Sequence, residues 1–261
     1  MKYFSLIKEA WRDYDYSRKI LSITDISIKV STNHVYRIIL KDGSKIIVKI
    51  SDYGYVSNFS EDHSIINALS INLSYPFENF LAKSLTKNGK LYIYEKKVKN
   101  SPIWVVFYNP IRTDKRPAKK QSLKSIKNLG KELANFHLAC KNITKILPSK
   151  SKTFHEDIKF IKKNIFSKTY FHFDNSQKIE IIKHCDIFIK NTNKIINKKN
   201  LLPVFIDWNI GNFSVDKNHN FFSRWDYDWF RIGHRTLDFY FLSRVCSQQG
   251  DSTLFTYSPL P

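Results

Sequence analysis

Short runs of alternating apolar and polar residues, separated by turn residues, fill the first part of the chain, a pattern typical of β-strands. The clearest example joins Val35–Leu40 to Lys45–Ile50 through Asp42-Gly43, and it predicts a hairpin with a tight turn. A second hairpin is expected to turn at Asn88-Gly89, between the runs 82–85 and 91–95. We therefore expect an antiparallel sheet in this part of the protein.

A helix and one more strand are expected beside these hairpins. Ser60, Glu61 and Asp62 precede a set of apolar residues at helical spacing, so we predict a helix that Ser60 caps, with acidic residues in its first turn. The apolar run 103–108 predicts a buried strand, which Asn109-Pro110 ends.

Beyond residue 110 the apolar positions recur at the spacing of helices. One amphipathic stripe contains Leu123, Ile126, Leu129, Leu133, Phe136 and His137. Helical patterns also cover 154–166 and 179–196, followed by the short apolar run 201–206. The sequence thus predicts an α+β protein with two lobes, a β-rich lobe over 1–108 and a helical lobe over 109–261.

The chain carries a large excess of positive charge, which has two explanations. Its 261 residues include 43 Lys and Arg against 23 Asp and Glu, a net charge of +20. An anionic partner would explain this excess, but Lys outnumbers Arg 34 to 9 and the basic residues are scattered. A general enrichment in Lys, Asn, Ile, Phe and Tyr explains it equally well.

The distribution of Cys, His and apolar residues argues against several classes of protein. The three cysteines are far apart and form no Cys-x-x-Cys pair, and the eight histidines form no His-x-x-x-His pair, so neither a disulfide framework nor a zinc site is expected. The charged start of the chain does not fit a signal peptide, and no apolar run is long enough to cross a bilayer. We expect a cytoplasmic protein without a membrane partner.

Three polar residues that can bind a cation lie among apolar and aromatic residues between positions 205 and 228. Asp207 and Asn212 precede the predicted strand 213–215, and Asp226 follows the predicted strand 221–225. Because these two strands are expected to pair, the three side chains can surround one point. Carboxylate and amide oxygens suit Mg²⁺, which binds substrate phosphates in many enzymes.

Four motifs, spread from about residue 30 to residue 245, together resemble those of the aminoglycoside/choline phosphotransferase family. They are Asn33-His34-Val35-Tyr36 followed by Lys49, the helix motif Leu129–His137, the loop from Asp207 to Asn212, and Trp225-Asp226-Tyr227-Asp228 followed by Leu237-Asp238-Phe239. The resemblance implies a bilobal protein-kinase-like fold, with an antiparallel sheet in the N-terminal lobe and a mainly helical C-terminal lobe.

The resemblance also implies roles for individual residues in phosphoryl transfer. Asp207 would be the catalytic base, Asn212 and Asp226 would hold Mg²⁺, and Lys49 would bind the phosphates of ATP, with GTP as an alternative nucleotide. Glu61 would position Lys49.

Two further roles concern the nucleotide base and the catalytic loop. The adenine would lie against the backbone from Phe107 to Asn109. Asp238, at the start of a helix, is expected to hold the backbone of the catalytic loop rather than to take part in the chemistry.

The sequence departs from the family pattern at three places. Phe205 stands where the family has a histidine that orients the loop, and the segment 31–34 contains no glycine. The chain also ends soon after Asp238, so we expect a C-terminally truncated or shortened lobe, or one completed by a partner.

Several other residues near these motifs have a structural interpretation. We expect His137 to be a hydrogen-bonded core residue, Cys140 to be buried, and Trp225 to belong to the core, whereas Trp208 and Trp229 could each line an acceptor site or the core. Four arginines, which could bind an anion or form surface ion pairs, are Arg224, Arg231, Arg235 and Arg244.

The sequence therefore favours an ATP-dependent phosphotransferase that acts on a hydroxyl of a small molecule, since no long segment separates Asp226 from Asp238. The acceptor could be cationic, neutral or anionic. The main alternative is a kinase-fold protein that binds a nucleotide or a partner but has lost catalysis. The last alternative is a nucleic-acid-binding protein, which would need a continuous basic face.

Overall fold

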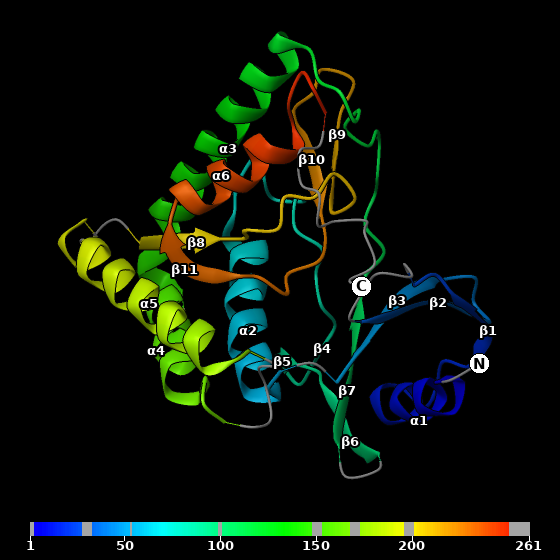
Figure 1. Cartoon of the computed structure of the whole chain (residues 1–261). Helices are drawn as coiled ribbons and strands as arrows, with labels where there is room; N and C mark the ends of the chain where they lie inside the picture. Colours follow the sequence, from blue (N-terminus) through cyan, green and yellow to red (C-terminus); the bar gives the residue numbers. More distant parts are fainter. Residues whose placement is uncertain are drawn as a thin grey trace.

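The computed structural model describes residues 3–27, 33–52, 54–98, 101–147, 153–167, 173–195 and 201–250 (Figure 1). The expected segment 31–34 lies partly outside these residues, as does the end of the chain after residue 250. Among the described residues, no helix has both the length and the apolar character needed to cross a membrane.

A five-stranded antiparallel sheet forms the N-terminal part, in the order β1-β2-β3-β7-β6. Its strands are β1 (Ile20–Asp25), β2 (His34–Leu40), β3 (Lys45–Ser51), β6 (Tyr94–Val98) and β7 (Ser101–Tyr108). The hairpin predicted around Asp42-Gly43 is confirmed, and Gly43 adopts φ +81°, a conformation that glycine reaches without steric cost.

The second predicted hairpin is present but much shorter than expected. It consists of β4 (Thr86–Lys87) and β5 (Lys90–Leu91), which turn through Asn88 and Gly89 with positive φ at both residues. The hairpin is short because the neighbouring residues pair elsewhere: Ser84 bridges to Tyr108, and β6 pairs with β7.

Strand β7 contributes side chains to two separate hydrophobic cores. Ile103, Val105 and Phe107 face the core beneath helix α1 (Phe4–Tyr14). Trp104, Val106 and Tyr108 alternate with them and face the core that helix α2 (Val56–Asn72) shares with the C-terminal part. Figure 1 shows α1 and α2 separated by the sheet.

Helix α2 begins one turn earlier than the sequence suggested. The helix starts at Val56, so Ser60 lies inside it and is not its cap, and the N-cap position, Tyr55, makes no side-chain capping bond. With this start, Asp62 and His63 are buried while Glu61 is exposed.

The C-terminal part is mainly helical, as predicted. Its helices are α3 (Leu123–Ile143), α4 (Phe154–Asn164), α5 (Asn175–Ile195) and α6 (Thr236–Val245), with a short 3-10 turn at Thr144–Ile146. Ser122 caps α3, and Thr153 and Glu156 form a reciprocal capping box at α4. These caps explain why both helices begin where the sequence predicts them.

Two small two-stranded sheets carry the loops between these helices. Strands β9 (Phe213–Val215) and β10 (Phe221–Arg224) pair as predicted. Strand β8 (Leu201–Val204) pairs with β11 (Arg231–His234), an element that the sequence analysis did not anticipate. The polar loop 205–212 lies between β8 and β9, and residues 225–230 connect β10 to β11.

Candidate active site

The loop after β8 is held by a fully buried carboxylate. Asp238 on α6 accepts hydrogen bonds from the backbone N–H groups of Phe205 (2.9 Å) and Ile206 (2.6 Å), and its second oxygen contacts His137 Nε2 (2.8 Å). Ile206 has φ +60°, which is strained for a β-branched residue and is stabilised here by its bond to Asp238. The predicted structural roles of Asp238 and His137 are therefore confirmed.

Asp207 and Asn212 contact each other on this loop. Asn212 Nδ2 donates to Asp207 Oδ2 (2.8 Å), and the N–H of Asn209 donates to Asp207 Oδ1 (3.2 Å). Burial raises the pKa of Asp207, although the charge of Arg224 opposes this shift. The N–H of Trp225 donates to the carbonyl of Asn212 (3.0 Å), which places Asn212 beside the residue preceding Asp226.

Lys49 joins the sheet to the segment after β10. Its Nζ lies 3.0 Å from Asp226 Oδ1 and 2.5 Å from Asp228 Oδ1, and the Lys49 side chain is only 9% exposed. Asn33, directly before β2, donates to the second oxygen of Asp228. Asp226 adopts φ +67°, another strained backbone position next to the loop. The two carboxylates thus converge on one cation.

The pKa values of this group reflect both burial and charge. Burial alone disfavours the charged form of Lys49, but Asp226 and Asp228 outweigh it and raise its pKa. For Asp226 burial is likewise outweighed, and the Lys49 ammonium lowers its pKa. The pKa of Asp228 is raised, first by burial and then by the neighbouring charge of Asp226, against the effect of Lys49.

The structure does not bring Glu61 to Lys49. Glu61 lies on the exposed face of α2, and the carboxylates that contact Lys49 are Asp226 and Asp228. The predicted Glu61–Lys49 pair is therefore wrong. On α2, the residue whose pKa Lys49 affects is the buried His63. Burial first, and then the charge of Lys49, lower the pKa of His63 to about 3.

The backbone from Phe107 to Asn109 is largely used within the protein. The Phe107 side chain is fully buried beneath α1, its carbonyl accepts from the N–H of Leu85 (2.8 Å), and the N–H of Asn109 donates to the carbonyl of Lys83 (3.0 Å). These two groups are therefore paired, contrary to their expected role in reading adenine.

The arginines and tryptophans near the site have different environments. Trp208 is fully buried, Trp225 packs against the core, and Trp229 is half exposed next to Asp228. Arg224, expected either to bind an anion or to lie at the surface, is fully buried. Arg231 forms ion pairs with Asp157 (2.8 Å) and Asp62 (3.8 Å).

Asp228 is the site residue that the sequence analysis did not single out. It lies two positions after Asp226, within the motif Trp225-Asp226-Tyr227-Asp228, and this spacing was the available signal. Together with Asp226 it supplies two carboxylates around one cation. Oxygen donors of this kind fit Mg²⁺, although the described residues contain no cluster of three or more His, Cys, Asp or Glu side chains with metal-binding geometry.

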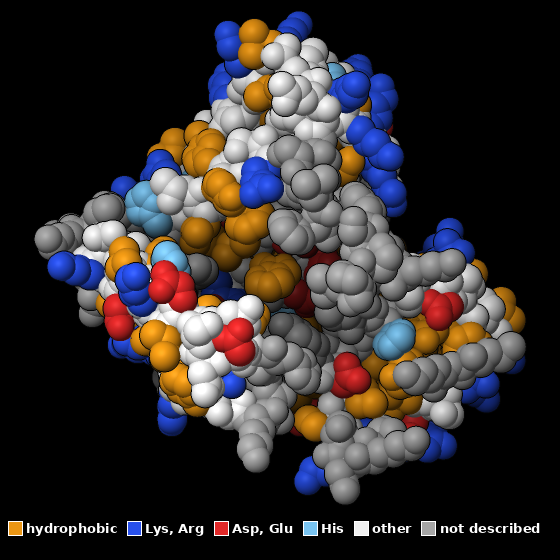
Figure 2. Space-filling model, in the orientation of Figure 1, with side chains coloured by type: hydrophobic (Ala, Val, Ile, Leu, Met, Phe, Trp, Pro, Cys, Tyr) orange, Lys and Arg blue, Asp and Glu red, His pale blue; other side chains and the backbone are white. Residues whose placement is uncertain are grey.

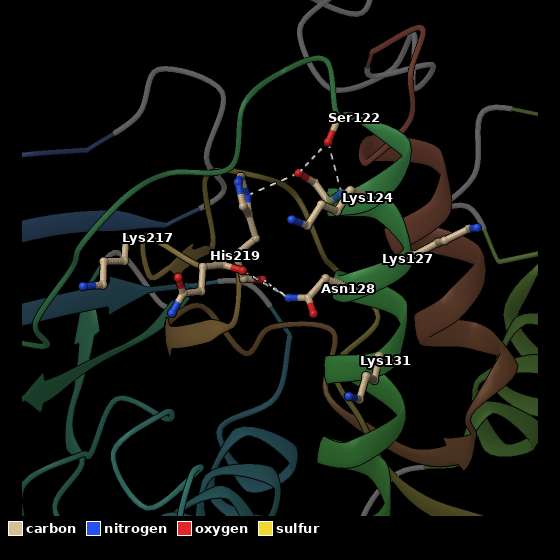
Figure 3. Close-up of a pocket in the computed structure, with 9 residues that line it drawn as sticks. Ser122, Lys124, Lys127, Asn128, Lys131, Lys217 and His219 are labelled. Carbon is tan, nitrogen blue, oxygen red and sulfur yellow. Dashed lines mark hydrogen bonds between the residues drawn. The ribbon is translucent and has the colours of Figure 1, made fainter.

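Two hollows of the molecule differ in the charge of their side chains. In Figure 2 acidic side chains lie deep in a hollow near the middle of the face shown, beside hydrophobic side chains. An open pocket of about 620 Å³ lies elsewhere, between the start of α3 and the β9–β10 turn (Figure 3). Its lining includes Lys124, Lys127, Lys131 and Lys217, and none of the candidate catalytic residues.

Comparisons with known proteins place this geometry in a known fold. No protein-family model matches the chain, and no curated protein matches its sequence. An amicoumacin kinase in complex with AMP-PNP, Ca²⁺ and Ami is similar with a TM-score of 0.66 and 14% identity, over 93% of this chain and 68% of that one. A microcompartment-associated aminopropanol kinase gives a TM-score of 0.61 and 14% identity, over 91% and 73%.

A spectinomycin phosphotransferase in complex with ADP and spectinomycin is also similar, with a TM-score of 0.51 and 17% identity over 92% of this chain and 73% of that one. The chain therefore has the bilobal protein-kinase-like fold that these phosphotransferases share, with an antiparallel sheet in its N-terminal part. The resemblance indicated by the motifs is confirmed at the level of the fold.

Proposed function

We propose that the protein is an ATP-dependent phosphotransferase that transfers the γ-phosphoryl group to a hydroxyl of a small molecule. The observation that carries the proposal is the convergence of Lys49 with Asp226 and Asp228, close to the hydrogen-bonded pair Asp207 and Asn212. This arrangement combines a cation for phosphates, oxygen donors for a metal ion and a carboxylate for a hydroxyl proton.

Each lobe would supply one part of the site. Residues 1–108 would bind the phosphates of the nucleotide, with Lys49 on the α- and β-phosphates, and the base would lie against the segment around Asn109 that joins the two lobes. ATP is the nucleotide to test first, with GTP as the alternative. Residues from 109 onward would supply the catalytic loop. Asn212 and Asp226, with Asp228 as a further donor, would hold Mg²⁺, which would neutralise phosphate charge.

In the reaction, the acceptor oxygen would attack the γ-phosphorus while its proton passes to the carboxylate of Asp207. The bond between the γ-phosphorus and the bridging oxygen would break, and ADP would leave with the electron pair. The raised pKa of the half-buried Asp207 suits a group that accepts a proton. Its hydrogen bonds to Asn209 and Asn212 would fix the orientation of the carboxylate.

The connection between Asp228 and α6 is short and contains only β11. It leaves no long segment that could bind a protein substrate, so a small molecule is favoured as the acceptor. The similar structures are kinases of amicoumacin and aminopropanol and a phosphotransferase of spectinomycin by name. An acceptor screen should therefore begin with amino alcohols and hydroxylated antibiotics, and should also include neutral and anionic sugars.

The first experiment measures thermal stabilisation by ATP with Mg²⁺ in the wild type, in Asp226→Asn and in Asp186→Asn. Asp186 is an exposed carboxylate paired with Lys162 on another surface, so it is a matched control for the loss of one charge. At a ligand concentration of 100 Kd the folded state gains about 2.7 kcal/mol. We expect Mg²⁺-dependent stabilisation of the wild type and of Asp186→Asn, and its loss in Asp226→Asn.

Proteins that bind the nucleotide are then tested for ADP formation with the acceptor panel. The absence of any shift at millimolar ATP in folded wild type would contradict the proposal. Binding without transfer to any acceptor would instead support the second candidate, a nucleotide-binding protein without catalysis. That candidate is favoured by one observation, the fully buried Phe205 at the position where the family has a histidine.

A further inference from the structure

Arg224 is a fully buried arginine beside the candidate catalytic loop. It ends strand β10, and its backbone is fixed on both sides: its N–H donates to the carbonyl of Phe80 (2.6 Å), and its carbonyl accepts from the N–H of Ala82 (3.0 Å). The backbone from which the Arg224 side chain extends is therefore held in place on both sides.

The guanidinium contacts the loop on three residues. Its Nη2 donates to the backbone carbonyl of Asp207 (2.8 Å). Its central carbon lies 4.2 Å from the ring centroid of Trp208 and 5.0 Å from that of Phe205, both within the range of cation–π attraction. One side chain thus contacts the residue two positions before the expected base, the residue directly after it, and its backbone carbonyl.

Stability alone does not explain a charged residue at this position. Nε and Nη1 of Arg224 are buried and have no hydrogen-bond partner among the described residues. Burial lowers the pKa of Arg224, and the carboxylates of Asp238, Asp207 and Asp226 only partly offset this effect. A buried guanidinium with two nitrogens that lack a partner costs desolvation energy, which an apolar side chain at the same place in the core would not. The arginine therefore needs a reason other than the stability of the core.

We propose that Arg224 is a positioning residue, which holds the backbone of Asp207 for phosphoryl transfer while Phe205 and Trp208 fix its guanidinium. In this way the buried arginine supplies the orientation that the family obtains from a histidine at the position of Phe205. The inference rests on the proposed function, because the loop is positioned for that reaction.

The test compares Arg224→Met, which keeps the length of the side chain without its charge, with Arg224→Lys, which keeps a cation and a donor. Arg37→Met, at an exposed position of β2, is the matched control. Three quantities are measured: kcat and KM for ATP, hydrogen exchange of the amides in residues 205–212, and Tm.

We expect kcat of Arg224→Met to fall about 10²-fold, as for a small misplacement of a catalytic group, with KM for ATP unchanged. Exchange in residues 205–212 should become faster. Arg224→Lys should recover most of kcat and of the protection, and Arg37→Met should behave as the wild type. An unchanged kcat in Arg224→Met, a loss that lysine does not restore, or a variant that does not fold would each overturn the proposal.

The exchange measurement separates this inference from the proposed function. If the wild type transfers phosphate to no acceptor, the proposed function fails, but the exchange of residues 205–212 can still be compared. Faster exchange in Arg224→Met that Arg224→Lys restores would support the positioning role. Equal exchange in all variants would overturn it.

Discussion

Replacing Asp238 by alanine should strongly destabilise the protein, because one carboxylate satisfies three buried donors. Two of them are the backbone N–H groups of Phe205 and Ile206, and the third is the His137 ring. An unsatisfied buried donor costs about 1–3 kcal/mol. Three of them give an expected loss of about 3–9 kcal/mol, a large part of the typical folding free energy of about 5–15 kcal/mol.

The matched control is Asp216→Ala in the β9–β10 turn. Asp216 also accepts three hydrogen bonds, from the N–H groups of Asn218 and Asn220 and from Asn220 Nδ2, but the turn lies at the surface. Water can replace the lost acceptor there, so we expect a loss of only about 1 kcal/mol. The difference between the two variants isolates the cost of burying unsatisfied donors.

The free energy of unfolding is measured by urea denaturation, followed by tryptophan fluorescence and by circular dichroism. Asp238→Asn should fall between the two alanine variants, because its amide oxygen can still accept from Phe205 and Ile206. A loss below about 1 kcal/mol for Asp238→Ala, or equal losses at positions 238 and 216, would refute the reasoning.

Three further predictions concern charges. Lys49→Met should abolish the stabilisation by ATP with Mg²⁺ in the thermal assay, and normal stabilisation would contradict the role of Lys49. The pKa of His63 is lowered to about 3 by burial and then by Lys49, whereas the unfolded value is about 6.5. Between these values the unfolded state binds more protons, so stability should fall with decreasing pH, by up to about 1.4 kcal/mol per pH unit. In His63→Gln this slope, measured by urea denaturation from pH 7 to 4.5, should be smaller, and an equal slope would exclude His63 as its source. Arg231→Met should cost about 3 kcal/mol because it breaks a largely buried ion pair. Lys162→Met, in an exposed pair, should cost less than about 1 kcal/mol, so equal losses would contradict the distinction.

The sequence predicted best those elements that local chemistry determines. The hairpin at Asp42-Gly43 depends on turn residues close in sequence, and α3 was predicted from the apolar stripe that starts at Leu123. The start of α2 was predicted one turn too late, because Ser60 fits a cap locally and only the packed structure shows that the helix continues back to Val56.

The candidate site was predicted less completely, because its contacts join residues far apart in sequence. The pairing of Lys49 with Asp226 and Asp228 spans 177 and 179 positions. These two carboxylates occupy the place beside Lys49 that the sequence analysis had assigned to Glu61. The burial of Arg224 was also missed, because arginine is rarely fully buried and no local pattern indicates such an exception.

Strand β7 limits how the protein could be divided or recombined. Side chains at alternate positions of β7 pack in different hydrophobic cores. Trp104, Val106 and Tyr108 pack in the core that also contains Leu133 and Phe136 of α3. A fragment ending at residue 108 would expose this apolar face to water and would be prone to aggregate. The N-terminal and C-terminal parts of the protein are thus not exchangeable modules. A chimera would have to transplant both faces of β7 together with the surfaces that they contact.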